Sequence, residues 1–337
     1  MTMTMKEHME MMDRIRQGIP LKKNVESSKT KTIKINGGIP VYRDSNNNVV
    51  NSSYFGWLSI ASTYNHNMTI NDLGGDRDGS GEGKVADQVV EEIKALGGEA
   101  AANYDSVGTV EGGQNIFNTA IESFGRADIL VNNAGVLRDR TLYNMEESDW
   151  DVIMEVHLKG HYNCTRPLVR YIRDNNVSGC RIINMSSVSG LFGNFGQVNY
   201  GAAKEGIAGF TRSLALEVAK YKCTVNTISP GAATRLTIDL IEAAGRKYDE
   251  NDWTQGPGQI APVVAWLCTE EASEITSQII HSQGGILGIM QQPAIIQSFT
   301  TDNLWTLDQL DKLIPELVET KKFHDQEVEE KGAPKKV

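Results

Sequence analysis

The stretch ADILVNNAG, residues 127–135, joins an apolar run directly to small and polar residues. The apolar half has the composition of a strand that is buried on both faces, and such strands belong to parallel sheets covered by helices. In sheets of this kind, ligands bind just beyond the carboxyl ends of the strands. The stretch therefore predicts an α/β protein with small polar residues placed at a ligand-binding edge.

The same alternation of apolar runs and helical patterns continues from residue 68 to about residue 290. It predicts a doubly wound, Rossmann-like parallel sheet with right-handed crossovers. The six predicted strands are residues 68–72, 99–104, 127–133, 180–186, 223–229 and 276–282. The predicted helices are residues 83–96, 109–124, 146–173, 199–221 and 257–270.

The two ends of the chain depart from this pattern. Residues 1–67 are predicted to be an atypical N-terminal segment, because residues 24–69 carry eight Asn and seven Ser, a composition that favours turns. Residues 68–290 are predicted to form a single domain. Residues 291–337 are predicted to form a helical extension whose apolar face, which includes Leu310 and Ile314, packs on the core or on a neighbouring subunit.

Composition excludes several classes of partner. A formal net charge of −10 and a pI near 5.2 argue against nucleic acid and against an anionic membrane surface. The four cysteines are widely spaced, so they predict neither a zinc site nor a disulfide framework. No apolar run reaches the roughly 18 residues of a membrane span, and the first residues lack the pattern of a signal peptide. We therefore expect a cytoplasmic protein with no metal site.

Tyr200 and Lys204 stand four positions apart in GQVNYGAAKEG, residues 196–206. On a helix these positions share a face, so the ammonium is expected to lie near the phenol and to lower its pKa. A phenol whose pKa falls by about 3 units can act as a general base near pH 7. By itself, the pair is more typical of an exposed polar helix face, so the interpretation needs support from other residues.

That support comes from the ends of three predicted strands. Ser187 follows the strand at 180–186, where its hydroxyl could meet the hydroxyl of Tyr200 at one substrate oxygen. The other two strand ends carry small or polar residues against which a flat ring could lie. These residues are Asn132, Asn133 and Gly135 in one case, and Pro230 and Gly231 in the other.

Taken together, these motifs resemble those of the short-chain dehydrogenase/reductase family. The matching residues are NNAG at 132–135, Ser187, the Y-x-x-x-K pattern of Tyr200 and Lys204, and SPG at 229–231, all in the family's order and spacing. The resemblance implies that Tyr200 exchanges a proton with the substrate oxygen. It also implies that Lys204 binds the nicotinamide ribose and lowers the pKa of Tyr200, while Ser187 positions the substrate.

The cofactor expected from the resemblance is NAD. Asp72 ends the first predicted strand, where a carboxylate can bind a ribose 2′-hydroxyl and would repel a 2′-phosphate, although an Asp before two glycines is also typical of a turn. The other cofactor contacts are carried over by resemblance. They are Asp105 and Ser106 for the adenine, and Asn132, Asn133, Ala134, Gly135, Pro230, Gly231, Ala232, Thr234, Tyr200 and Lys204 on the nicotinamide side.

The sequence departs from the family in two places. The family's first motif, Thr-Gly-x-x-x-Gly-x-Gly, is missing, since residues 40–60 contain Gly56 as their only glycine and TIKINGG at 32–38 lacks the glycine spacing. Either the N-terminal segment is replaced or wrongly assembled, or the protein has given up tight NAD binding. His157 stands where the family generally has an Asn that supports a proton-relay water, and an imidazole could hold such a water.

Several stretches, among them NNAGVLRDRTL and LFGNFGQVNYGAAK, resemble one branch of the family. This branch contains the R-specific 3-hydroxyacyl-CoA dehydrogenases of the multifunctional β-oxidation enzymes and bacterial relatives, some of them acting in steroid side-chain breakdown; His157 is typical of it. A 3-hydroxyacyl-CoA is thus the expected substrate. A hydroxysteroid or other alcohol dehydrogenase, and a catalytically silent scaffold, remain alternatives. The resemblance also implies a homodimer or homotetramer, paired through helices 146–173 and 199–221.

Overall fold

The computed structural model describes residues 67–73, 85–95, 97–234 and 254–330, with a few isolated positions between 238 and 252; side chains are described up to residue 319. The sheet-bearing part up to Met290 and the part from Gln291 onward belong to separate compact units. The predicted N-terminal segment 1–67, including TIKINGG, lies outside the described residues except for Asn67.

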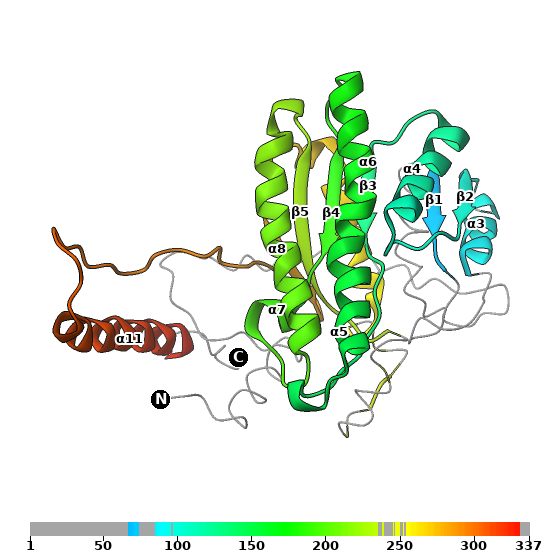
Figure 1. The fold of residues 1–337 in the computed structure, drawn as a ribbon. Helices are drawn as coiled ribbons and strands as arrows, with labels where there is room; N and C mark the ends of the chain where they lie inside the picture. Colours follow the sequence, from blue (N-terminus) through cyan, green and yellow to red (C-terminus); the bar gives the residue numbers. More distant parts are fainter. Residues whose placement is uncertain are drawn as a thin grey trace, which may run out of the picture. The chain divides into compact units, whose positions relative to one another are not determined.

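Five strands form the main sheet, and four of them are parallel, as the sequence predicts (Figure 1). The fifth strand is antiparallel and was not predicted. It forms a hairpin through Gly284 and Gly285, whose φ angles of +55° and +82° suit a tight turn between paired strands. In sheet order the strands are β3 (Ile129–Asn132), β4 (Arg181–Met185), β5 (Thr224–Gly231), β6 (Ile279–Gln283) and β7 (Ile286–Ile289).

The two remaining strands form a sheet of their own. β1 (Met68–Asn71) pairs in parallel with β2 (Ala100–Asn103), and within the described residues neither strand pairs with the main sheet. All six predicted strands are observed, and the doubly wound, Rossmann-like α/β fold predicted from sequence is confirmed. The three apolar residues of β3 are half-buried, whereas every residue of β4, which is paired on both sides, is buried; among the described residues β3 pairs with β4 alone.

Alternating side chains along the strands bury both faces of the main sheet. Ile182 and its neighbours pack against α6 (Gly160–Asn175) and α8 (Val198–Val218), which Figure 1 shows in front of β4 and β5. Ile183, one residue further, packs on the opposite face with Val264 of α10 (Ala261–Leu267). This period-two burial is what fixes the register of the strands and so the position of their ends.

The smaller sheet is covered in the same way. α3 (Val85–Ala95) buries Val89, Val90 and Ile93 against β1 and β2, as its helical spacing predicts. α4 (Val110–Phe124) follows β2 and packs against both β1 and α6. Its first turn is capped by Thr109, whose side chain accepts a hydrogen bond from the Gly112 amide.

The helix predicted at 146–173 is not continuous. It consists of α5 (Glu147–Ile153), a π-helical turn η2 (Met154–Lys159) and α6. Such turns are uncommon and are often found at functional sites, and this one contains His157. A short helix, α7 (Val188–Phe192), also lies between β4 and α8, where no element was predicted.

The part of the chain after Gln291 contains α11 (Leu307–Glu330), which begins where the predicted apolar face begins. Leu307 and Ile314 on this helix are 78% and 51% exposed. Packing of this face on a neighbouring subunit stays a prediction. None of the helices among the described residues has the length and apolar character needed to cross a bilayer.

Candidate functional site

The ends of three neighbouring strands carry the residues that the sequence predicts to form the site. Because β3, β4 and β5 are parallel and adjacent, Gly135 after β3, Ser187 after β4 and Gly231 at the end of β5 all lie at one edge of the sheet. The convergence predicted from sequence is thus confirmed by the pairing of these strands. Pro230 and Gly231 are the last residues of β5 itself, two residues beyond the predicted end.

Ser187 is held at the start of α7. Its side-chain oxygen accepts a hydrogen bond from the Ser189 amide at 3.1 Å, which caps the helix. Gly190 lets α7 approach α8, because a Cβ at this position would lie 2.6 Å from the backbone nitrogen of Glu205. This close approach brings the Ser187 hydroxyl near the phenol of Tyr200, where its donor lowers the pKa of the phenol.

Lys204 is buried on α8, and hydrogen bonds hold both its side-chain nitrogen and its backbone carbonyl group. Its Nζ donates to the Met185 carbonyl oxygen at 2.6 Å, and its own carbonyl accepts from the Ser186 hydroxyl at 2.7 Å. Nζ lies 5.4 Å from the centre of the Tyr200 ring. The last residues of β4 therefore set the position of Lys204 relative to Tyr200.

The electrostatics of this pair differ from the prediction. Burial raises the pKa of Tyr200 to about 12; the hydrogen bond from Ser187 opposes this rise, and the negative charge of Asp139 adds to it. Burial also lowers the pKa of Lys204 to about 7. Lys204 is not among the groups that lower the Tyr200 pKa, because a lysine with a pKa of about 7 is uncharged at the pH where a phenol with a pKa of about 12 ionises.

His157 lies against Tyr200 and completes the wall of the site. The two rings meet edge to face with their centres 5.2 Å apart, and His157 Nε2 lies 2.8 Å from the Val136 carbonyl oxygen. Burial, and then the charge of Lys204, lower the pKa of His157 well below its usual value, so the ring is neutral near pH 7. Its Nδ1 is buried without a hydrogen-bond partner among the described residues.

Substituting Ala for Gly135 is expected to destabilise the fold by about 1–3 kcal/mol, because the new Cβ would overpack the site. That Cβ would lie 2.6 Å from Cε1 of His157, whose ring has no free space in which to move because Val136 and Tyr200 hold it. Chemical denaturation measures the free energy of unfolding. Gly258→Ala is the control, since a Cβ there meets nothing within 4 Å; equal effects of the two substitutions would contradict this account.

Two neighbours of the site were not predicted. Gln197, three residues before Tyr200, donates from Nε2 to Asp139 at 2.7 Å, and so holds this carboxylate where its charge acts on the phenol. His161 is buried one turn after His157, and its Nδ1 lies 2.5 Å from the His157 carbonyl oxygen. Gln197 and Asp139 are 58 positions apart, so no local pattern in the sequence could have linked them.

The predicted cofactor residues fall into two groups. Asn132 was predicted to contact the cofactor. Its side chain is buried and donates to the side chains of Thr165 and Asn184, so it stabilises the sheet. Both carboxylate oxygens of Asp105 likewise accept internal hydrogen bonds, from Asn103 and Asn115, each at 2.9 Å. The remaining predicted contacts lie near strand ends and stay predictions. They are Asp72, Ser106, Asn133, Ala134, Gly135, Pro230, Gly231, Ala232 and Thr234.

The described residues fit one end of a nicotinamide dinucleotide. Lys204 uses one of its three N–H donors on Met185, which leaves donors for ribose hydroxyls, and the exposed Asn133 and Ala134 with Gly135 leave room for a flat ring. A diphosphate needs backbone N–H groups from a glycine-rich turn at a helix N-terminus. The sequence before β1 lacks glycines at that spacing, and residues 1–66 lie outside the described residues.

No group of three or more potential metal ligands occurs among the described His, Cys, Asp and Glu residues. His281 does not belong to any of the motifs found in the sequence. It is buried, and its Nδ1 lies 2.9 Å from the Ser229 carbonyl oxygen. Cys164, Cys180, Cys223 and Cys268 are all unpaired thiols, and burial raises the pKa of each. The chemistry of this region therefore centres on Ser187, Tyr200 and Lys204.

Comparison with known proteins agrees with this constellation. Residues 80–243 match the family described as short chain dehydrogenase. A short-chain type dehydrogenase/reductase of Mycobacterium tuberculosis is 44% identical over 220 residues, which are 65% of this chain and 74% of that protein. Peroxisomal multifunctional enzyme type 2 of Mus musculus is 45% identical over 213 residues, 61% of this chain, and the chain spans only 27% of that enzyme.

A solved structure supports the same assignment. The crystal structure of a short chain dehydrogenase from Mycobacterium avium is 32% identical and superposes with a TM-score of 0.70. The match covers 85% of this chain and 94% of that one. With Ser187, Tyr200 and Lys204 brought together at the strand ends, the chain belongs to the short-chain dehydrogenase/reductase family and is an oxidoreductase.

Proposed function

We propose that this protein oxidises the secondary alcohol of a 3-hydroxyacyl-CoA, with NAD as the hydride acceptor and Tyr200 as the general base. The observation that carries the proposal is the packing of Tyr200 against the buried Lys204, whose Nζ lies 5.4 Å from the centre of the Tyr200 ring, with Ser187 close enough to lower the pKa of the phenol. The choice of a CoA thioester rests on the resemblance of NNAGVLRDRTL and LFGNFGQVNYGAAK to the R-specific 3-hydroxyacyl-CoA dehydrogenases.

The proton steps are assigned to residues of the chain. In alcohol oxidation, the phenolate oxygen of Tyr200 takes the proton of the substrate hydroxyl, and in the reverse direction the phenol returns it. The Ser187 hydroxyl, which lies near enough to Tyr200 to lower its pKa, donates to the same substrate oxygen. Lys204 binds ribose hydroxyls through its remaining N–H groups, and its charge supports the phenolate where Lys204 is protonated, at and below about pH 7. When bound, NAD supplies the carbon that accepts the hydride.

The choice between NAD and NADP rests on Asp72, which directly follows β1. A carboxylate at this position can accept a hydrogen bond from the ribose 2′-hydroxyl and repels a 2′-phosphate. NAD is therefore the proposed cofactor. Contacts to the diphosphate of NAD would change the affinity for the cofactor. They would not change the groups that act on the substrate, because those groups lie at the nicotinamide end.

The substrate is tested with a panel of alcohols: a medium-chain R-3-hydroxyacyl-CoA, its S enantiomer and a hydroxysteroid. We expect kcat/KM for the R thioester to exceed each of the others by at least about 100-fold, because a misplaced carbinol carbon loses alignment with Tyr200 and the hydride acceptor. Formation of the reduced cofactor, followed by its absorbance at millimolar NAD, measures the rate. Faster oxidation of the steroid would reject the thioester and favour a hydroxysteroid dehydrogenase.

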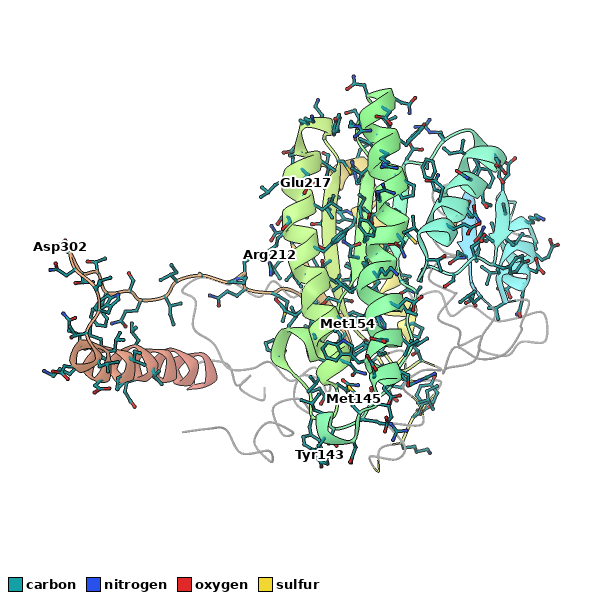
Figure 2. All side chains as sticks on the ribbon, in the orientation of Figure 1. Tyr143, Met145, Met154, Arg212, Glu217 and Asp302 are labelled. Atoms are coloured by element: carbon teal, nitrogen blue, oxygen red, sulfur yellow. The ribbon has the colours of Figure 1, made fainter. Side chains whose placement is uncertain are left out.

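The proposal includes pairing of two subunits through α6 and α8. On this face of the single chain a depression of about 530 Å³ is lined by the side chains of Met154, Leu158, Tyr162 and Phe210, together with the charged Asp151, Glu155 and Lys159. Figure 2 labels Met154 where η2 passes beside α8. Leu216, further along α8, is 81% exposed. Apolar surface of this kind supports an interface between copies of the chain.

A further inference from the structure

Apolar side chains are exposed beside the candidate site, in the segment that joins α7 to α8. Phe192, Phe195 and Val198 follow one another at a spacing of three, and all are exposed, Phe195 by 59%. The polar Gln197 and Asn199, which stand among them in the sequence, are buried instead. Exposed large apolar side chains next to buried polar ones reverse the usual distribution, and such a surface marks a place where something binds.

Hydrogen bonds explain why the polar side chains are inside. Gln197 accepts from Asn194 at 2.8 Å through its Oε1, and its Nε2 donates to Asp139 at 2.7 Å. Asn199 donates from Nδ2 to the Arg138 carbonyl oxygen at 3.0 Å. These bonds join the segment to the loop that follows β3. The polar side chains are therefore used in holding the two segments together, and the apolar ones are left at the surface.

The loop after β3 adds a fourth apolar residue to this surface. Arg140 pairs with Gln197 in a parallel bridge, so the residues that follow run alongside the start of α8, where Val198 stands. Leu142, which begins the short helix η1 (Leu142–Asn144), comes two residues after the bridge and is 63% exposed. We call this surface the apolar shelf; its residues are Leu142, Phe192, Phe195 and Val198.

The apolar shelf is continuous with the groups that act on the substrate. Ser187 caps α7, which ends at Phe192 and packs against α8 (Figure 1). Tyr200 stands two residues after Val198 on α8. The depression on α6 and α8 that supports pairing of subunits is lined by other residues. An apolar surface that begins at the reacting hydroxyls therefore fits an apolar part of the substrate better than a second copy of the chain.

We propose that the apolar shelf binds the acyl chain of the thioester beyond its carbinol carbon, so that the protein prefers long acyl chains to short ones. This inference rests on the proposed function, because it takes the carbinol at Tyr200 as the starting point of the chain. A shelf contacts the acyl chain on one side only, so each methylene is about half-buried. The affinity should therefore rise about twofold for each methylene that lies on the shelf.

Isothermal titration of the full chain with butanoyl-CoA and dodecanoyl-CoA tests the inference without turnover, since neither ligand carries a 3-hydroxyl group. We expect dodecanoyl-CoA to bind at least about 30-fold tighter, which corresponds to about five methylenes on the shelf. Phe195→Ser should reduce this ratio by at least about fivefold, because it removes the largest contact surface. Phe195→Leu keeps an apolar side chain and should keep most of the ratio. Dissociation constants within about threefold of each other, or no binding of either ligand, would overturn the inference.

Trp266→Ser is the matched control. Trp266 is an aromatic residue of α10 that is 46% exposed, and α10 packs on the opposite face of the sheet, so the ratio should not change. An equal loss of the ratio in Phe195→Ser and Trp266→Ser would contradict a specific shelf.

Two further measurements separate the remaining outcomes. If sedimentation velocity shows that Phe195→Ser dissociates an oligomer while the ratio of affinities stays the same, the shelf is an interface between copies, and the inference is wrong. If the ratio is as expected but NAD oxidises no R-3-hydroxyacyl-CoA of any length, the acyl-binding shelf stands and the proposed reaction is rejected. Failure of the inference and failure of the proposed function are thus distinguishable.

Discussion

Replacing Tyr200 with phenylalanine is expected to lower kcat for alcohol oxidation by about 1000-fold or more, because the substrate proton loses its acceptor. The ring and its edge-to-face contact with His157 remain in the variant, so packing changes little. Burial raises the pKa of Tyr200 to about 12, so the phenolate is scarce near neutral pH. Oxidation by the wild-type chain should therefore accelerate as the pH rises above 7, and the variant should show no such rise.

The measurement is steady-state oxidation of the R thioester across the pH range, together with thermal unfolding of each variant. Tyr143→Phe is the matched control, because Tyr143, in the short helix η1 (Leu142–Asn144), is 82% exposed and has no role in the proposed chemistry. Activity of Tyr200→Phe within about tenfold of wild type would remove Tyr200 from the role of general base. A wild-type chain without turnover on any alcohol would instead support the silent-scaffold alternative.

Lys204→Met is expected to have opposite effects on activity and stability. Loss of the ammonium removes the charge beside the phenol and the ribose donors, so turnover should fall by at least about 100-fold. The same substitution should raise the free energy of unfolding by roughly 1–4 kcal/mol near pH 7, since it replaces a buried charge with an apolar chain of similar length. The loss of the bond to the Met185 carbonyl offsets part of this gain.

The stability gain of Lys204→Met should depend on pH with a definite sign. Burial lowers the pKa of Lys204 from 10.5 to about 7. Between these values the unfolded chain binds a proton that the folded chain does not, so the stability of the wild type increases as the pH rises through this window. Below about pH 7 the cost of the buried charge is fully present. The gain should thus be largest near pH 7 and below, and should shrink toward pH 10.5.

Denaturant unfolding at several pH values measures this difference, with Lys220→Met as the control for the loss of one lysine. Lys220 lies over the ring of Tyr221 near the surface, so its replacement should leave the pH dependence unchanged. A Lys204→Met variant that is less stable than the wild type at pH 7 would mean that Lys204 stabilises the fold. The activity and stability effects would then no longer have the same cause.

Local patterns were enough to locate most elements of the main sheet. The strand predicted at 180–186 is observed as Arg181–Met185, and the helix predicted at 199–221 begins one residue earlier, at Val198. Both are set by short-range properties: an unbroken run of residues that suits a strand buried on both faces, and an apolar period of 3.6. The antiparallel β7 is apolar at three of its four residues, ILGI, and was missed because so short a run has no readable period of its own.

The break in the helix predicted at 146–173 could not be seen in the same way. The residues of η2, MEVHLK, are compatible with an ordinary α-helix, and the π-helical turn depends on packing against α8 and on the contact of His157 with Val136. Among the described residues, β1 and β2 pair only with each other, which was also not predicted. The missing glycine motif left two interpretations open, a replaced or wrongly assembled N-terminal segment and a loss of tight NAD binding, and residues 1–66 lie outside the described part of the chain.

The sequence by itself determined the family, the order of the strands along the chain and the pairing of Tyr200 with Lys204, because each follows from residues that are close in sequence or share one helix face. Only the tertiary structure decided which groups are deprived of water. The pKa of about 12 for Tyr200 and about 7 for Lys204 arise from β4, α7 and α8 closing around them. Burial is a property of elements far apart in the chain, so no local pattern can encode it.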